Sequence, residues 1–125
     1  YLTKAGAQLW KYRREEQSRA IGFVRRIMDM DVPRIAIENP VGILSTVVRK
    51  PDQIVHPWWF GEPFTKATCL WLKGLPKLVP VNPVEPDTYW IDSSNRGALK
   101  RGVRDPKERS RSFRGIAAAM AAQWG

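Results

Sequence analysis

The sequence predicts a mixed α/β fold with about three strands and flanking helices. Residues 34–37 form a short β-branched run that stops at Glu38-Asn39-Pro40, which is typical of a buried strand. Residues 66–73 alternate in a way that predicts another strand with both faces covered. Residues 14–30 carry apolar side chains at spacings of three and four, which predicts an amphipathic helix. At 125 residues, the chain is long enough for one domain, 1–125.

The predicted helix over residues 14–30 has an apolar stripe made by Ala20, Phe23, Val24, Ile27 and Met28. Pro33 disfavours helix at the residue before it and therefore ends the element nearby. Residues 1–11 contain a glycine and no clean period, so we expect a loop or a short helical turn there. Because the chain opens without methionine, we expect it to start inside a longer product.

The middle of the chain predicts two further strands. Residues 41–48 form either a short helix or a tight apolar crossover, and residues 53–60 begin as a strand that Pro57 ends or confines to an edge. In the strand over residues 66–73, Thr68, Leu70 and Leu72 share one face, and the opposite face includes Cys69. A sheet of about three strands leaves an open edge, so we expect association with another chain or chain segment.

The C-terminal third predicts little regular structure before its last helix. Residues 74–86 hold four prolines and read as an extended loop. Residues 89–91 either form a short strand or pack as an apolar cluster. Residues 92–114 form a basic, irregular segment. Residues 113–124 predict a helix with Ser110 or Ser112 as its cap.

The charge balance points to a polyanionic partner. The chain carries 21 Lys and Arg against 12 Asp and Glu, a net charge of +9. Residues 96–114 hold eight basic and two acidic residues, so the segment is either a nucleic-acid contact or a solvated basic loop. No apolar run approaches the ~20 residues of a membrane helix, and one cysteine fits a reducing cytoplasm.

Few residues offer chemistry on their own. Glu38 and Asn39 either hydrogen-bond the edge of a base or form a structural turn before Pro40. Cys69 sits in an apolar strand, where burial is its usual fate, and His56 has no second histidine to make a metal site. The glycines match no phosphate-binding loop. The tryptophans are either base-stacking platforms or core residues.

Several motifs occur in order along nearly the whole chain. They are Ile37-Glu38-Asn39-Pro40, Arg49-Lys50-Pro51-Asp52-Gln53-Ile54, Pro57-Trp58-Trp59-Phe60-Gly61-Glu62-Pro63, Thr65-Lys66-Ala67-Thr68-Cys69-Leu70-Trp71-Leu72-Lys73-Gly74-Leu75-Pro76, and the ending with Arg109-Ser110-Arg111-Ser112-Phe113, Gly115-Ile116-Ala117 and Gln123-Trp124-Gly125. In these motifs the chain resembles a phage and bacterial family described as DNA cytosine methyltransferase-like, small relatives of the cytosine-5 DNA methyltransferases.

The resemblance implies a fold, a reaction and a set of residues. The fold would be a partial class I, Rossmann-like methyltransferase sheet, of which this chain holds the C-terminal half. Glu38 would hold the target cytosine, Asn39 would support the same pocket, and Lys66 and Thr68 would lie near the flipped base. Glu38 and Lys66 would then line a single base-sized pocket. The methyl donor would be S-adenosylmethionine, and the helix over residues 113–125 would return to the cofactor site.

The chain lacks the two parts of the family that bind the cofactor and supply the nucleophile. Relatives carry a cofactor-binding half with a glycine-containing loop and a Pro-Pro-Cys segment, and this sequence has neither. Cys69 does not replace that nucleophile, and Pro40 stands where the closest enzymes have valine. The resemblance therefore implies two partners, namely DNA and either a separate N-terminal half or a second copy. Six basic residues are expected to bind DNA: Arg96, Lys100, Arg101, Arg104, Arg109 and Arg111.

Three functions follow from these observations. The first is transfer of a methyl group to DNA cytosine, provided that the missing half is supplied. The second is DNA binding without catalysis on a retained scaffold. The third is a small particle-assembly protein whose basic segment contacts nucleic acid.

Overall fold

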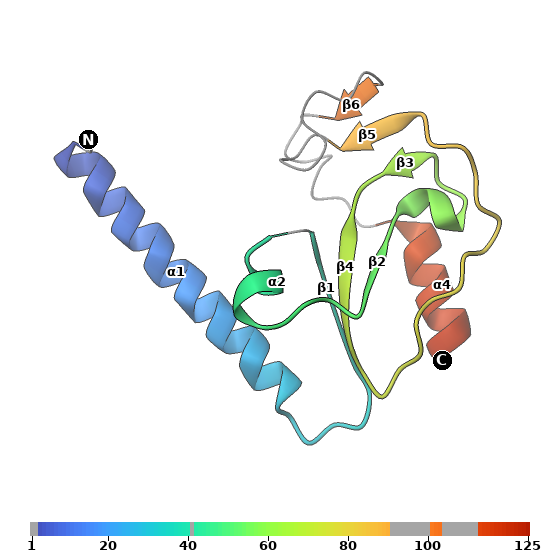
Figure 1. Ribbon diagram of the computed structural model, residues 1–125, viewed down its shortest axis with the longest axis horizontal. Helices are drawn as coiled ribbons and strands as arrows, with labels where there is room; N and C mark the ends of the chain where they lie inside the picture. The colour runs from blue at the N-terminus through green and yellow to red at the C-terminus, as the bar shows by residue number, and fades with distance from the viewer. Residues whose placement is uncertain (1–2, 41, 91–100, 104–112) are drawn as a thin grey trace.

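The computed structural model describes residues 3–40, 42–90, 101–103 and 113–125. It confirms a mixed α/β fold (Figure 1). In the described ranges the helices are α1 (Lys4–Met28), α2 (Leu44–Val47) and α4 (Arg114–Trp124), with a 3₁₀ helix η1 (Pro57–Phe60). The strands are β1 (Ile35–Pro40), β2 (Gln53–Val55), β3 (Phe64–Thr65), β4 (Thr68–Lys73), β5 (Thr88–Trp90) and β6 (Arg101–Val103).

The central sheet has the order β1-β4-β2, and both outer strands run antiparallel to β4. β1 and β2 are therefore parallel to each other, with α2 in the connection between them and β4 inserted in the middle. A smaller sheet has the order β3-β5-β6 and is parallel. The Rossmann-like arrangement expected from the resemblance is mostly parallel, so the central sheet shares only part of that expectation.

Glu38 and Asn39 lie inside β1, whereas the sequence predicted that they follow the strand. β1 pairs with β4 over six residues, from Ile35 opposite Lys73 to Pro40 opposite Thr68. Proline is tolerated at this position because β1 is at an edge of the described sheet and Pro40 is in the last pair of the ladder. The paired length, rather than the proline, therefore determines where β1 ends.

Helix α1 begins ten residues earlier than the sequence predicted, because it starts at Lys4 rather than at residue 14. Thr3 is its N-cap, and the Thr3 hydroxyl accepts a 3.0 Å hydrogen bond from the Gly6 N–H. The prediction of a loop or a short helical turn over residues 1–11 was wrong, because Gly6 lies within the first turn of a helix that Thr3 caps and that continues without a break. α1 then runs for 25 residues and ends before Asp29.

The two faces of the central sheet carry separate cores. On one face, Val55, Leu70 and Leu78 pack with Phe60 and with α4. On the other, Cys69 and Trp71 pack with Leu44 of α2, and three residues of α1 cover them: Ile21, Val24 and Met28. Figure 1 accordingly shows α1 and α2 on one side of the sheet and α4 on the other. The prediction that both faces of β4 are covered is confirmed, since Leu70 and Trp71 are both buried.

Prolines determine two of the connections, namely the end of β2 and the loop after β4. Pro57 opens η1 and thereby ends β2, so residues 56–60 are not the strand continuation that the sequence left open. Residues 74–87 contain no helix or strand, which confirms the extended loop. Gln53 holds this loop through Leu78, accepting from its N–H and donating to its carbonyl at 2.8 Å each. Gln123 does the same to Val79, at 2.8 and 2.9 Å.

Helix α4 is capped differently from the prediction. Its N-cap is Phe113, which makes no capping hydrogen bond of its own, and the predicted caps Ser110 and Ser112 lie outside the described residues. Glu62 instead accepts a hydrogen bond from the Gly115 N–H. In the described parts of the chain, no helix combines the length and the apolar character that spanning a bilayer requires.

Candidate functional site

Glu38 and Asn39 project from opposite faces of the sheet, because neighbours on a strand alternate. Glu38 lies opposite Leu70 and is exposed on the α4 side. Asn39 lies opposite Cys69 and is half-buried on the side that α1 and α2 cover. The structure therefore places the Glu38 carboxylate and the Asn39 amide on opposite faces of the sheet and does not bring them together.

Thr68 is on the same face as Glu38, but it is not accessible. It is diagonal to Glu38 across the β1–β4 pair, a relationship that separates residues by roughly 7–8 Å. Only 3% of Thr68 is exposed, and its hydroxyl donates a 3.1 Å hydrogen bond to the Lys66 carbonyl. The Thr68 hydroxyl therefore stabilises the turn of the chain just before β4 and is not accessible to a ligand.

Lys66 precedes β4 and packs near the start of α4. Its Nζ lies 5.6 Å from the centre of the Phe113 ring, a distance that suits a cation–π contact. Lys66 is four positions before Leu70, the partner of Glu38, which corresponds to at most roughly 13 Å along the chain. Glu38 and Lys66 are therefore not partners in the β1–β4 pairing.

Cys69 is a structural residue in this arrangement. It is 1% exposed, between Trp71 and Leu44 in the core under α1 and α2. Burial raises the pKa of the Cys69 thiol and the charge of Glu38 adds to that rise, while a hydrogen bond with Ser45 opposes it. A protonated, enclosed thiol is a poor nucleophile, so β4 offers no substitute for the missing Pro-Cys thiolate.

The predicted DNA-binding residues of the basic segment lie almost wholly outside the described part of the chain. This is the case for Arg96, Lys100, Arg104, Arg109 and Arg111. Arg101 begins β6, which pairs with β5, and only its backbone is described.

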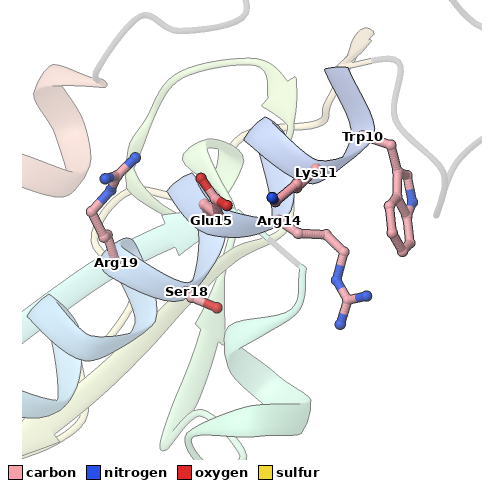
Figure 2. A pocket seen from close by; sticks show the side chains of 6 residues that line it. All are labelled: Trp10, Lys11, Arg14, Glu15, Ser18 and Arg19. Atoms are coloured by element: carbon pink, nitrogen blue, oxygen red, sulfur yellow. The ribbon is translucent and has the colours of Figure 1, made fainter. Parts of the chain in front are cut away.

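A groove on α1 was not predicted. It is lined by Trp10, Lys11, Arg14, Glu15, Ser18 and Arg19, which Figure 2 shows on successive turns of the helix. The Arg14 guanidinium lies 4.7 Å from the centre of the Trp10 ring, and Arg19 pairs with Glu16. The density of Lys and Arg over residues 11–19 is the sequence signal for this groove, and it becomes one surface only because the helix extends back through Trp10 and Lys11.

The described residues do not form a metal or cofactor site. Within these ranges, no three His, Cys, Asp or Glu side chains gather as metal ligands. S-adenosylmethionine in the expected fold needs a glycine-containing turn between a parallel strand and a helix. In the part of the chain described here, the helix that follows β1 is α2, which has only four residues (Leu44–Val47), and the sequence around Gly42 matches no such glycine motif.

A scan against protein-family models gives no match to this chain, and neither does a search of curated proteins or of solved structures.

Proposed function

We propose that this chain is the C-terminal part of a cytosine-5 DNA methyltransferase-like protein, which binds DNA and contributes a cytosine-recognition carboxylate. The observation that carries the proposal is the position of Glu38. The Glu-Asn-Pro motif lies on a strand that six residue pairs hold against β4, and the Glu38 side chain is exposed there. A rigid strand positions a recognition group more precisely than a loop does.

The arrangement of the central sheet supports the proposed fold. β1 and β2 are parallel, and antiparallel β4 lies between them. Otherwise parallel sheets often carry an antiparallel strand close to one edge. β1 has one neighbour in the described sheet, so its other edge is open to further parallel strands. The central sheet thus has the form expected of one end of a doubly wound sheet.

The exposed apolar side of α1 also supports a missing half. Leu9, Tyr12 and Phe23 are 50%, 57% and 57% exposed, and their spacing places them along one side of the helix. Such a run of large apolar residues marks a surface that another element covers. In this proposal, a cofactor-binding half covers that side of α1 and continues the sheet beyond β1.

The proposed roles of the chain's own residues are limited. The Glu38 carboxylate accepts a hydrogen bond from the exocyclic amine of a flipped cytosine and so orients the ring. Lys66, which precedes β4, contributes positive charge close to the DNA backbone. S-adenosylmethionine and the attacking thiolate belong to the missing half, because the described residues fit neither.

Methyl transfer from labelled S-adenosylmethionine to DNA tests this proposal. The assay compares this chain alone, a cofactor-binding half of a related methyltransferase alone, and the two together. Transfer that requires both polypeptides is the expected result. Failure of the mixture, with both parts folded and bound to each other, would exclude the methyltransferase role.

A second candidate is nucleic-acid binding without catalysis, as in a scaffold or particle-assembly protein. The observation that favours it is Cys69, the one cysteine of the chain, which is buried with a raised pKa. The net charge of +9 then remains as the functional feature. DNA binding with no transfer under any combination of halves would favour this candidate.

A further inference from the structure

The positive charge of the chain is concentrated in two segments. Residues 96–114 carry eight basic and two acidic residues, and α1 carries seven basic and two acidic residues. The rest of the chain holds six basic and eight acidic residues, a net charge of −2. The net charge of +5 on α1 is therefore a local feature and not a share of a uniformly basic surface.

Six of the seven basic side chains of α1 lie along one side of the helix, called here the basic face. It comprises Lys4, Lys11, Arg14, Arg19, Arg25 and Arg26, all of them exposed, and it also includes one acidic residue, Glu15. Arg25 donates a hydrogen bond to the Val47 carbonyl. Lys4 and Lys11 are seven residues apart, as are Arg19 and Arg26, and Arg14 and Arg25 are eleven apart. With 3.6 residues per turn, these spacings return to nearly the same side of the helix after two or three turns.

The dimensions of the basic face suit a nucleic-acid backbone. A helix of 25 residues is about 37 Å long, close to the ~34 Å of one turn of duplex DNA. The groove in Figure 2 lies on this helix, and Trp10 holds the Arg14 guanidinium at 4.7 Å. An arginine placed over an aromatic ring is already oriented, so it loses less side-chain entropy on meeting a phosphate.

We propose that the basic face of α1 binds the phosphate backbone of DNA, as a contact surface separate from the segment at residues 96–114. The inference rests on the proposed function for its partner and extends it to a second site. It predicts sequence-independent binding, because phosphate contacts position a protein without reading bases.

Charge argues against the other occupants of this face. A second copy would bring two helices of net charge +5 together, which repel. A membrane surface requires an uninterrupted apolar side, whereas the exposed apolar side with Leu9 and Tyr12 also carries Glu16 at helical spacing. Farther along α1, Phe23 continues this exposed side, whereas Val24 and Met28 are packed on the sheet.

The salt dependence of binding to a labelled duplex oligonucleotide tests the proposal. The test variant is Lys11→Gln/Arg14→Gln, and the matched control is Lys50→Gln/Lys77→Gln, which removes two exposed charges elsewhere. Each phosphate contact adds about 0.9 to the slope of log affinity against log salt. The test variant should therefore lose about 1.8 from the slope and bind on the order of 60-fold more weakly at about 0.1 M salt. The control should match the unmodified chain.

Three results would overturn the proposal: equal slopes for the two double variants, no DNA binding by the unmodified chain, or preferential binding to vesicles of equimolar phosphatidylcholine and phosphatidylserine. Glutamine is nearly as good a helix former as lysine or arginine, so circular dichroism should be unchanged. The binding assay contains no methyl donor. Equal slopes for the test and control variants would therefore exclude only the DNA contact by α1. Loss of methyl transfer with the slope difference intact counts against the proposed function alone.

Discussion

The carboxylate of Glu62 accepts a hydrogen bond of 2.7 Å from the backbone N–H of Gly115. Glu62 lies in the turn after η1, and Gly115 lies in the first turn of α4. The contact satisfies one of the donors that a helix leaves unpaired at its start and places negative charge at the positive end of the helix dipole. A residue 53 positions away thus performs the capping that the flanking serines were expected to supply.

Removing this cap should destabilise the fold. We expect Glu62→Ala to lower the free energy of unfolding by about 1–2 kcal/mol, the usual effect of losing a helix cap. Glu62→Gln keeps an accepting oxygen and loses only the charge, so it should cost less than about 1 kcal/mol. Urea unfolding measures both values. Equal losses for the two variants would mean that charge, and not the hydrogen bond, stabilises α4.

Gly115 and Gly22 should respond oppositely to alanine. A Cβ at Gly115 would lie 2.4 Å from the carbonyl oxygen of Phe60, whereas the nearest atom to one at Gly22 is the flexible end of Arg26, at 3.4 Å. Gly115→Ala should therefore cost about 1–3 kcal/mol through overpacking between α4 and η1. Gly22→Ala should stabilise the chain by about 0.5–1 kcal/mol, because it removes a flexible residue from a helix. Thermal unfolding distinguishes them, and a neutral Gly115→Ala would contradict this packing.

Asp52 should make stability depend on acid pH. A hydrogen bond from Arg49 lowers the pKa of this carboxyl below 3.8, and the Leu72 N–H, at 2.6 Å from the carboxylate, lowers it further against the opposing effect of burial. Because the folded pKa is the lower one, the stabilisation is complete above pH 3.8 and is lost as the pH falls through the folded value.

The measurement for Asp52 is the melting temperature from about pH 5 to about pH 2, the range over which such a carboxylate titrates. Asp52→Asn has no proton to gain, so its melting temperature should fall less steeply over this range than that of the unmodified chain. Parallel curves would show that other carboxylates account for the acid sensitivity.

The two glutamines that hold the proline-rich loop should each matter for stability. Gln53→Ala removes two hydrogen bonds to Leu78, and Gln123→Ala removes two to Val79. At about 0.5–1.5 kcal/mol for each bond, either change should cost about 1–3 kcal/mol of unfolding free energy. Gln17→Ala, on the exposed part of α1, is the control and should change stability by less than about 0.5 kcal/mol. Similar small effects at all three positions would show that the loop is held by its apolar contacts instead.

Local sequence signals predicted the three strands of the central sheet and the last helix, because each depends on a short pattern. They missed β3, and they gave β6 (Arg101–Val103) as part of an irregular segment, because strands of two or three residues carry too short a pattern. The alternation around Leu70 and Trp71 predicted a strand covered on both faces, and Pro57 predicted the end of β2. Local patterns cannot predict contacts between side chains that are far apart in the sequence. The cap of α4 comes from Glu62, and the loop at Leu78 and Val79 is held by Gln53 and Gln123, so no local signal announced them.

The candidate site was predicted in part. The family resemblance pointed to the motif that contains Glu38, and the Glu38 side chain is exposed on β1. Asn39 projects from the other face because the strand continues through it, and Thr68 is buried because β2 and β4 pair there. These outcomes depend on strand register, which antiparallel pairing sets across the chain and a single sequence does not reveal.

The central claim is that Glu38 recognises a cytosine when a cofactor-binding half completes the chain. The most direct measurement is methyl transfer to DNA by the reconstituted mixture, with Glu38→Gln compared with the unmodified chain and duplex affinity measured in parallel. The account predicts a loss of transfer of at least about 100-fold, the scale of one lost transition-state contact, with DNA affinity changed less than about threefold. Equal transfer by both proteins, or loss of folding in Glu38→Gln, would contradict it.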